Sequence, residues 1–188
     1  MIYIIADKEI NMPTGEIKLV DIKTRLGKDV LVEENDAIRP LYNYNEKGYE
    51  PVKHLALQSG AYSRYKKDKN FINHEFENLY KKWIDDSVNK KIADEIIVSR
   101  SDTGQYDGLA TLKYRDHLAE IGLIAVDEQS RGKKIGLSLL YYVNNLTLKK
   151  GLNRVEVVTQ FENVAAMNLY QKAGYKVMSK KYIYHLWI

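Results

Sequence analysis

From Pro51 onward, the apolar residues of this chain switch several times between helical and strand spacing. A helix is predicted over Asn73–Lys91 because its apolar residues recur every three or four positions, with Glu and Lys between them. Ile121–Val126 is almost uninterruptedly apolar, which is typical of a strand covered on both faces. The predicted order is a short helix near Pro51, helix Asn73–Lys91, strands Ile92–Arg100, Leu109–Arg115 and Glu120–Val126, a helix to about Lys150, strand Arg154–Gln160, helix Asn163–Gly174 and strand Tyr175–Ile188.

The first fifty residues have a different pattern. Short β-like runs, Ile2–Ala6, Glu16–Ile22 and Asp29–Glu33, are separated by Asn, Gly, Pro and Asp. We therefore expect a small β-rich N-terminal segment, residues 1–50, packed on a larger domain of residues 51–188. The alternation of strands and helices in that domain predicts an α/β (α+β) fold with a central sheet flanked by helices.

Composition narrows the possible functions. The chain of 188 residues carries a net charge of +4, which suits acidic small ligands better than nucleic acid, and it has no cysteine for a disulfide or a thiolate ligand. The N-terminus lacks the features of a signal peptide, and no apolar run approaches the ~20 residues that cross a membrane. We expect a cytoplasmic protein without membrane insertion. The four histidines show no spacing that indicates a metal site.

A basic, glycine-containing turn follows the apolar strand. Arg131, Gly132, Lys133, Lys134, Ile135 and Gly136 lead directly into an amphipathic helix. Backbone N–H groups and roughly half a positive charge gather at a helix N-terminus, so this turn is suited to a pyrophosphate. A solvated helix start with basic side chains is the alternative interpretation. A left-handed conformation would cost a lysine about 1 kcal/mol or more, whereas a helical one tolerates it. We expect Lys134 to be already helical, since Gly136 still permits close approach of the backbone.

The turn and a downstream helix together resemble the GNAT acyltransferases, which move an acetyl group from acetyl-CoA to an amine. Arg131 and Gly136 fit the turn of that family, and Lys134 stands where the family usually has Gly. Asn163, Tyr170 and Gly174 keep the family's spacing in the following helix. The resemblance implies the GNAT fold, in which the sheet separates between two neighbouring parallel strands, here Glu120–Val126 and Arg154–Gln160.

The resemblance also implies roles for individual residues. The backbone of Leu123, Ile124, Ala125 and Val126 is expected to bind the acetyl and pantetheine groups of acetyl-CoA, with Asn163 as a further contact or simply as a helix N-cap. Tyr170 is the candidate general acid for the leaving thiolate, although its helical spacing also fits a core tyrosine. Glu120 is the candidate general base or a solvated strand end. Asp68, Glu75 and a bound water are alternatives for that base.

The acceptor is less constrained. Leu55–Asp68, Val158–Asn163 and the C-terminal Tyr184–Ile188 resemble the GNAT enzymes of the dTDP-fucosamine acetyltransferase group, which acetylate the 4-amino group of a dTDP-linked amino-dideoxy sugar. This implies that Arg64 and nearby lysines face a diphosphate and that Tyr62 and Tyr65 stack on thymine or sugar. Alternatives are acetylation of a protein N-terminus, a lysine or another small amine, and a non-catalytic acyl-CoA-binding domain. The apolar C-terminal strand could pair within the sheet or across a homodimer.

Overall fold

The computed structural model describes residues 1–10, 17–32, 40–45 and 48–188. Along the chain the described elements are β1 (Ile2–Ala6), β2 (Ile17–Asp29), β3 (Leu41–Asn43), α1 (Tyr49–Ser59), α2 (Arg64–Lys67), α3 (Glu75–Val88), β4 (Glu95–Arg100), β5 (Tyr106–Tyr114), β6 (Ala119–Val126), a 3₁₀ turn (Glu128–Ser130), α4 (Ile135–Lys149), β7 (Arg154–Gln160), α5 (Val164–Lys172) and β8 (Lys176–Leu186). From α1 onward, these are the predicted elements with ends shifted by a few residues, together with the short α2 and the 3₁₀ turn, which were not predicted. The predicted α/β fold is confirmed.

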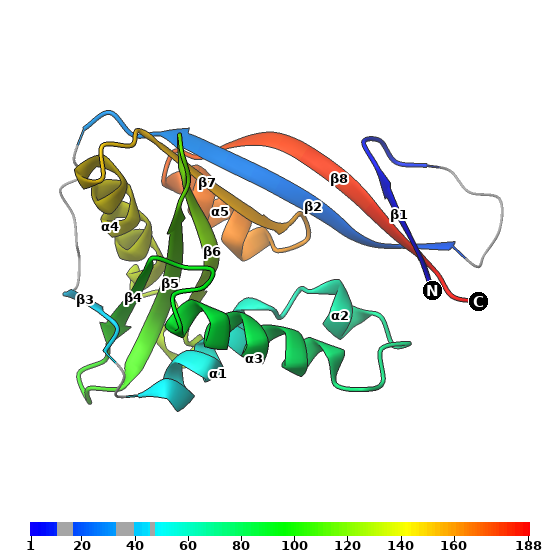
Figure 1. Ribbon diagram of the computed structural model, residues 1–188, viewed down its shortest axis with the longest axis horizontal. Helices are drawn as coiled ribbons and strands as arrows, with labels where there is room; N and C mark the ends of the chain where they lie inside the picture. Colours follow the sequence, from blue (N-terminus) through cyan, green and yellow to red (C-terminus); the bar gives the residue numbers. More distant parts are fainter. Residues whose placement is uncertain (11–16, 33–39, 46–47) are drawn as a thin grey trace.

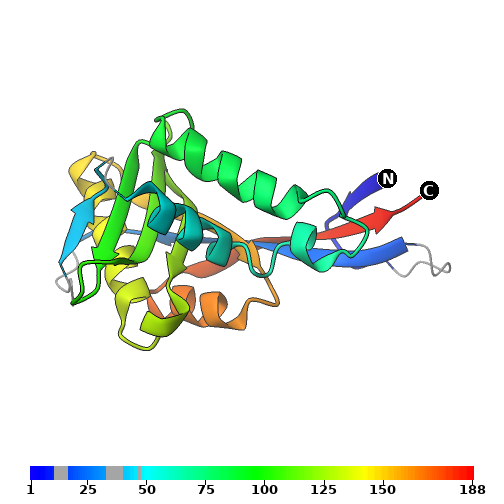
Figure 2. The same cartoon turned by 90° about the horizontal axis from the view of Figure 1, so that it is seen from below.

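One mixed sheet organises the molecule (Figure 1). Its strands follow the order β1-β8-β2-β7-β6-β5-β4-β3, and all described neighbours are antiparallel except the parallel pair β6 and β7. Helices α1 and α3 cover one face of the sheet, and α4 and α5 cover the other (Figure 2). Each face therefore has its own apolar core, which explains the continuous apolar character of the central strands.

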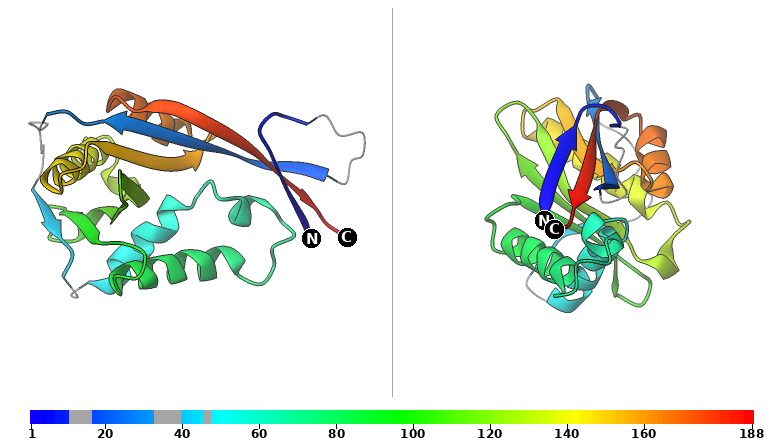
Figure 3. Two further views of the ribbon diagram at one scale, coloured as in Figure 1. Left: turned by 45° about the horizontal axis from the view of Figure 1, so that its top comes forward. Right: turned by 90° about the vertical axis from the view of Figure 1, so that its right-hand side faces the viewer.

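The strands of residues 1–50 are part of this sheet. β2 lies between β7 and β8, pairing with both, and β1 extends the sheet beyond β8 (Figure 3). The expected separate runs Glu16–Ile22 and Asp29–Glu33 are wrong: β2 is one strand of 13 residues that ends at Asp29, while residues 16 and 33 lie outside the described residues. The described strands of residues 1–50 therefore belong to the sheet itself, and the boundary expected at residue 50 does not mark a separate segment packed on it.

Strand β2 mixes charged and apolar positions because its two faces differ. Leu26 is fully buried in the core under α4 and α5, and Thr24 is likewise buried. Asp21, Lys23 and Arg25, at the alternate positions, point to the other side of the sheet and line a cavity. Lys23 and Arg25 lie in the part of β2 that was not predicted as a strand, and their charges belong to its cavity-facing side.

A β-bulge in β6 changes which face its side chains occupy. Ile121 opposes Leu112 of β5 and Ile124 opposes Ala110, so Gly122 and Leu123 together oppose Thr111. The alternation of the strand shifts by one position there. Ile121 packs in the core under α4 and α5, whereas Leu123 packs in the core under α1 and α3.

Gly122 is the residue that permits this bulge. A Cβ at that position would approach the Thr111 hydroxyl oxygen to 2.9 Å. The Thr111 hydroxyl accepts a hydrogen bond from the backbone N–H of Leu123 at 2.9 Å, which fixes the second residue of the bulge. The bulge depends on contacts with β5, so it could not be predicted from the sequence, which shows only an apolar run at this point.

Lys134 does not have the helical conformation that we expected. It is the N-cap of α4 with φ 61° and ψ 13°, in the left-handed region. A glycine is favoured at such a position because a Cβ raises the backbone energy there by about 1–2 kcal/mol. The family's usual Gly at this position is thus explained by backbone conformation, and this chain carries strain in its place.

Replacing Leu26 with Ala should reduce the free energy of unfolding by about 2–5 kcal/mol, because a fully buried side chain leaves a cavity in the core. Urea unfolding monitored by circular dichroism measures the change. Leu31→Ala, at a side chain that is 80% exposed, is the control and should change stability by less than about 0.5 kcal/mol. An equal, small effect of both variants would mean that β2 is not part of the cooperative core.

Replacing Lys134 with Gly should raise the free energy of unfolding by up to about 1 kcal/mol through relief of the left-handed strain. Lys133→Gly is the matched control, since it removes the same charge from a neighbouring residue that does not have a positive φ. It should be neutral or destabilising. Differential scanning calorimetry measures the stability of both variants. If both are stabilised equally, the loss of charge and not the relief of strain explains the effect.

Candidate functional site

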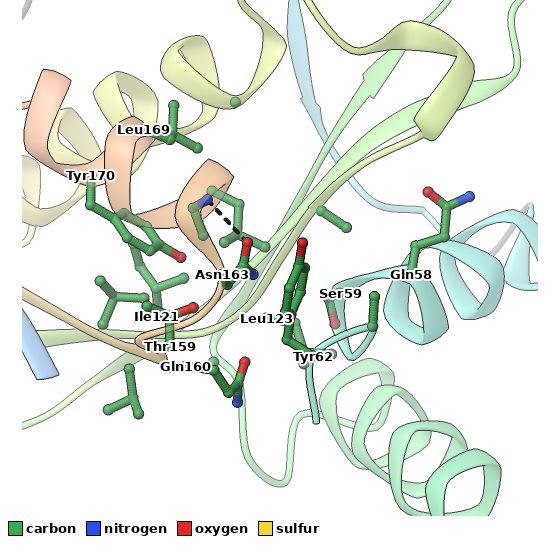
Figure 4. A pocket seen from close by; sticks show the side chains of 18 of the residues that line it. Gln58, Ser59, Tyr62, Ile121, Leu123, Thr159, Gln160, Asn163, Leu169 and Tyr170 are labelled. Carbon is green, nitrogen blue, oxygen red and sulfur yellow. Dashed lines mark hydrogen bonds between the residues drawn. The ribbon is translucent and has the colours of Figure 1, made fainter. Parts of the chain in front are cut away.

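A single large cavity of about 1250 Å³ contains most of the residues that the sequence singled out. Its walls come from β2, β6 and β7, from the ends of α4 and α5, and from the segment joining α1 to α2 (Figure 4). The cavity brings together Tyr62, Arg64, Tyr65, Glu120, Leu123, Ile124, Ala125, Val126, Arg131, Gly132, Lys134, Ile135, Gly136, Asn163 and Tyr170. Lys133 is exposed and does not line it.

The two parallel strands separate inside this cavity. β6 and β7 pair from Ala119 and Val155 to Ile121 and Val157, and no pair follows along the described strands. The expected separation of the sheet between these strands is present. It leaves backbone N–H and C=O groups of both strands without a strand partner, and such groups require another hydrogen-bonding partner.

The bulge determines which backbone groups face the gap. The N–H groups of Leu123 and Asp127 point to the β5 side, where they donate to the Thr111 hydroxyl and to the Asp107 carbonyl at 2.9 Å. Since backbone groups alternate in direction along a strand, those of Ile124 and Val126 point into the gap. The expectation for four residues is therefore refined: Leu123 and Ala125 contribute buried side chains, and Ile124 and Val126 contribute the free backbone groups.

The basic turn lies at one end of the same gap. Gly132 and Lys134 both have positive φ, and the first backbone bond of α4 runs from the Ser138 N–H to the Lys134 carbonyl at 3.1 Å. The N–H groups that precede Ser138 begin the helix and have no carbonyl one turn earlier to bind. Together with the side chains of Arg131 and Lys134, they make this end of the cavity chemically suited to an anion.

Gly136 allows close contact between α4 and α5. A Cβ there would lie 2.9 Å from Cδ2 of Leu169. Leu169 precedes Tyr170, so this contact sets the position of α5 relative to the turn. The absence of a side chain at Gly136 therefore helps to place Tyr170, the candidate general acid.

A residue that sequence reasoning missed connects the turn to the opposite layer. The Gln58 amide of α1 donates to the Asp127 carboxylate at 3.0 Å and accepts from the Glu128 N–H at 3.1 Å. Asp127 also caps the 3₁₀ turn by accepting from the Gln129 N–H at 3.0 Å. These bonds fix the start of the anion-binding turn, and a lone Gln in an amphipathic helix gave no signal of that role.

Helix α5 positions Asn163 and Tyr170. The Asn163 side-chain oxygen accepts from the Ala166 N–H at 3.1 Å, so the residue is the helix N-cap, and its amide NH₂ is not used by the cap. Tyr170 is 2% exposed and packs against Tyr175, while its phenol oxygen points toward the space between Asn163 and Thr159 (Figure 4). Burial raises the pKa of Tyr170 above its usual value, which keeps the phenol protonated at neutral pH.

Among the carboxylates considered as base, Glu120 is the one that lines the cavity. It is half-buried, and Arg115 approaches it to 3.4 Å. Asp68 instead binds His185 at 2.6 Å and Trp187 at 2.9 Å, and Glu75 binds the Asn73 backbone at the start of α3. Neither of them lines the cavity.

The acceptor candidates lie on and just before α2. Ser63 caps this short helix by accepting from the Tyr65 N–H at 3.3 Å. The Arg64 guanidinium lies over the rings of Tyr3 and Tyr65, at 5.1 and 4.6 Å from their centroids, with Nη1 3.9 Å from Oδ2 of Asp21. Tyr62 is 37% exposed at the cavity wall.

Asp21 was missed by sequence reasoning because the run predicted around it, Glu16–Ile22, gave no indication that one face of the strand lines a cavity. Burial raises the pKa of its carboxyl to about 6, an effect that the neighbouring Arg64 partly offsets. Lys23, two positions along the same face, forms no ion pair with any described residue. Arg25, further along, is bound by Glu156 at 2.7 Å. The alternation of β2 would have revealed these residues had its length been recognised.

In the described part of the chain, no three His, Asp or Glu side chains gather in a way that could hold a metal ion. No described helix has the length and apolar character needed to cross a membrane.

Comparisons with known proteins identify the family. Residues 59–175, more than half of the chain, match the acetyltransferase (GNAT) family. The spore coat polysaccharide biosynthesis protein SpsD of Bacillus subtilis (strain 168) is 27% identical over 138 residues, which are 73% of this chain and 47% of SpsD. The chain thus spans about half the length of that relative.

Solved structures agree on the fold. A conserved protein from Staphylococcus epidermidis ATCC 12228 is similar over 92% of this chain and 64% of its own, with a TM-score of 0.66 and 17% identity. The PaiA N-acetyltransferase from Thermoplasma acidophilum, solved in complex with coenzyme A, is similar over 79% of this chain and 98% of its own, with a TM-score of 0.61 and 19% identity. Members of the matched family are N-acetyltransferases that use acetyl-CoA. The chain belongs to the acetyltransferase (GNAT) family and has the GNAT fold.

Proposed function

We propose that this enzyme transfers the acetyl group of acetyl-CoA to the amino group of a nucleotide-linked amino sugar, a dTDP-linked amino-dideoxy sugar in the first instance, for polysaccharide synthesis. The observation that carries the proposal is the continuity of one cavity, from the anion-binding turn of α4 through the β6–β7 gap to a basic wall on β2 and α2. The name of the relative SpsD, a spore coat polysaccharide biosynthesis protein, supports this substrate class.

The donor half of the cavity suits acetyl-CoA. The free N–H groups at the start of α4, with Arg131 and Lys134, are suited to its diphosphate. The gap-facing backbone groups of Ile124 and Val126 are suited to the amides of its pantetheine arm, and the Asn163 NH₂ offers one more donor. A gap-facing N–H of β6 also supplies a hydrogen bond to the thioester oxygen, where negative charge develops during transfer.

The acceptor half favours an anionic acceptor over a lysine-bearing peptide. Lys23, Arg25, Arg64, Lys66, Lys113 and Arg115 line it, against the carboxylates Asp21 and Glu120. Arg25, Arg64, Lys113 and Arg115 each pair with a carboxylate. Among the described residues, Lys23 and Lys66 form no ion pair, and Lys66 lies over the ring of Phe76. A diphosphate satisfies an unpaired cation, whereas a basic peptide is repelled by it.

The chemistry is direct transfer. The neutral amine attacks the thioester carbonyl carbon, the new C–N bond forms, the C–S bond breaks and the sulfur leaves as thiolate. Tyr170 gives its phenol proton to that thiolate, and the amine loses a proton to a base, for which Glu120 or a water held beside it is the candidate. Solvent then restores the proton of Tyr170.

A screen of acceptors tests the proposed function. Purified enzyme is supplied with acetyl-CoA and with dTDP-4-amino-4,6-dideoxyhexoses, UDP-amino sugars, free amino sugars or lysine peptides, and thiol release is measured together with the mass of the product. Sugar nucleotides should show the highest kcat/KM, and the same sugar without its nucleotide should lose at least about tenfold, equivalent to one charged contact. A preference for peptides or for free amines would refute the substrate class while leaving acetyl transfer intact.

Replacing Tyr170 with Phe should lower kcat by about 10²- to 10⁴-fold, since the leaving thiolate loses its proton donor. Tyr175→Phe is the matched control: its hydroxyl binds Asn144 at 2.7 Å inside the core, so that variant should lose stability but little activity. Stabilisation by acetyl-CoA, measured as a thermal shift, should be the same in Tyr170→Phe and in the wild type. Unchanged kcat in Tyr170→Phe would remove the residue from the proton transfer.

A further inference from the structure

Two buried polar atoms in the acceptor half have no partner. Oδ1 of Asp21 and Nε of Arg64 are both inaccessible to solvent and make no hydrogen bond with described residues. The Asp21 side chain is 2% exposed, and both residues line the cavity. A buried donor and a buried acceptor left unpaired destabilise the protein, so two of them on paired residues that line one cavity indicate a ligand group that completes them.

We propose that Asp21 and Arg64 form a subsite that binds a neutral hydroxyl group of the acceptor. This inference rests on the proposed function and specifies which part of the acceptor Arg64 recognises. The hydroxyl donates its proton to Oδ1 of Asp21 and accepts a hydrogen bond from Nε of Arg64. A hydroxyl is the simplest group that both donates and accepts, and sugars carry it in abundance.

The surroundings of Arg64 favour a neutral ligand over a phosphate. The Asp21 carboxylate, 3.9 Å away, balances the charge of the guanidinium and repels a second anion. A phosphate also offers only acceptors once ionised, which leaves Oδ1 of Asp21 unpaired, and an ammonium offers only donors, which leaves Nε of Arg64 unpaired. The expectation that Arg64 faces the diphosphate is therefore replaced in this proposal.

The guanidinium is also held in place. Stacking between Tyr3 and Tyr65, together with a hydrogen bond from Nη2 to the Tyr65 hydroxyl at 3.2 Å, fixes its plane and leaves Nε as the free donor. Asp21 lies on strand β2, at the bulge that separates it from Leu19 in the pairing with β8, and is paired there with Ile183. Both groups are thus oriented before a ligand arrives, which is what selective recognition of a hydroxyl requires.

Lys23 then takes the charged part of the acceptor. It lies two positions from Asp21 on the same face of β2 and opposite Gln160 of β7, closer to the gap where transfer occurs. An acceptor that spans these groups has its amine at the gap, its anionic group at Lys23 and a hydroxyl-bearing part at Asp21 and Arg64. In this arrangement, Lys23 recognises the charge of the acceptor, and Asp21, two positions away on the same strand, recognises a hydroxyl.

The test combines deoxygenated acceptors with variants of the subsite. The best acceptor from the screen is compared with analogues that each lack one hydroxyl, and kcat/KM is measured for the wild type, Asp21→Ala, Asp21→Asn and the control Asp29→Ala. Asp29 lies on the same strand, is exposed and binds Arg154 outside the cavity. In the wild type, loss of one particular hydroxyl should cost about 10- to 100-fold, because it leaves buried partners unpaired.

In Asp21→Ala the penalty for that same hydroxyl should fall to the part that its bond with Arg64 contributes, whereas Asp29→Ala should keep the penalty in full. Asp21→Asn retains a carbonyl acceptor and should keep part of it. Acetyl-CoA-induced thermal shifts that match the wild type show that the variants are folded. Equal deoxygenation penalties in the wild type and Asp21→Ala would overturn the subsite.

Failure of the proposed function gives a different result from failure of the subsite. If the wild type acetylates no sugar nucleotide, the screen shows this before any variant is made, and the comparison is run with whichever hydroxyl-bearing amine is acetylated. If Asp21→Ala selectively lowers the contribution of one hydroxyl of that acceptor, the subsite is still supported. If Asp21→Ala changes the contribution of no hydroxyl of any such acceptor, the subsite is refuted.

Discussion

The separation of β6 from β7 is the constraint on which the rest of this structure depends. Two parallel strands that pair only as far as Ile121 and Val157 leave backbone groups without partners in the middle of a sheet. Such groups are costly when buried and dry, so the gap persists only as part of a cavity. The donor site is therefore built largely from backbone, and the surrounding side chains keep the strands apart and in orientation.

Three side-chain arrangements maintain that gap. Gly122 and Thr111 form the bulge that turns the backbone groups of Ile124 and Val126 toward it. Gln58 ties the layer of α1 and α3 to the turn that follows β6. Gly136 lets α5 approach α4, and α5 begins directly after β7, so the helix that carries Tyr170 is fixed to the second strand of the gap. The proposed donor binding and the proposed proton transfer thus depend on the same geometry.

Sequence predicted what depends on local pattern and missed what depends on tertiary contacts. The apolar run of β6, the motif at Arg131 and Gly136, and the helix with Asn163 and Tyr170 were all recognisable and lie together in the cavity. The strand β2 was divided because its cavity-facing residues are charged, and a strand with one polar side in a sheet centre resembles a loop. The positive φ of Lys134 was indicated only by the family's usual Gly at that position, because a lysine by itself favours a helical conformation.

The cavity-facing side chains of β2 also explain why the family motif alone does not identify the acceptor. The motif residues belong to β6, α4 and α5, on the donor side, whereas Asp21, Lys23 and Arg25 come from a strand inserted beside β7 from the other end of the chain. Their alternation places three charged groups along one wall, and burial there raises the pKa of Asp21 because the strand is covered by α2. A carboxylate is retained at that position despite the cost of burying it, beside an arginine with one donor unpaired. Neither residue belongs to the two apolar cores of the sheet, which is why we assign both to the proposed acceptor subsite.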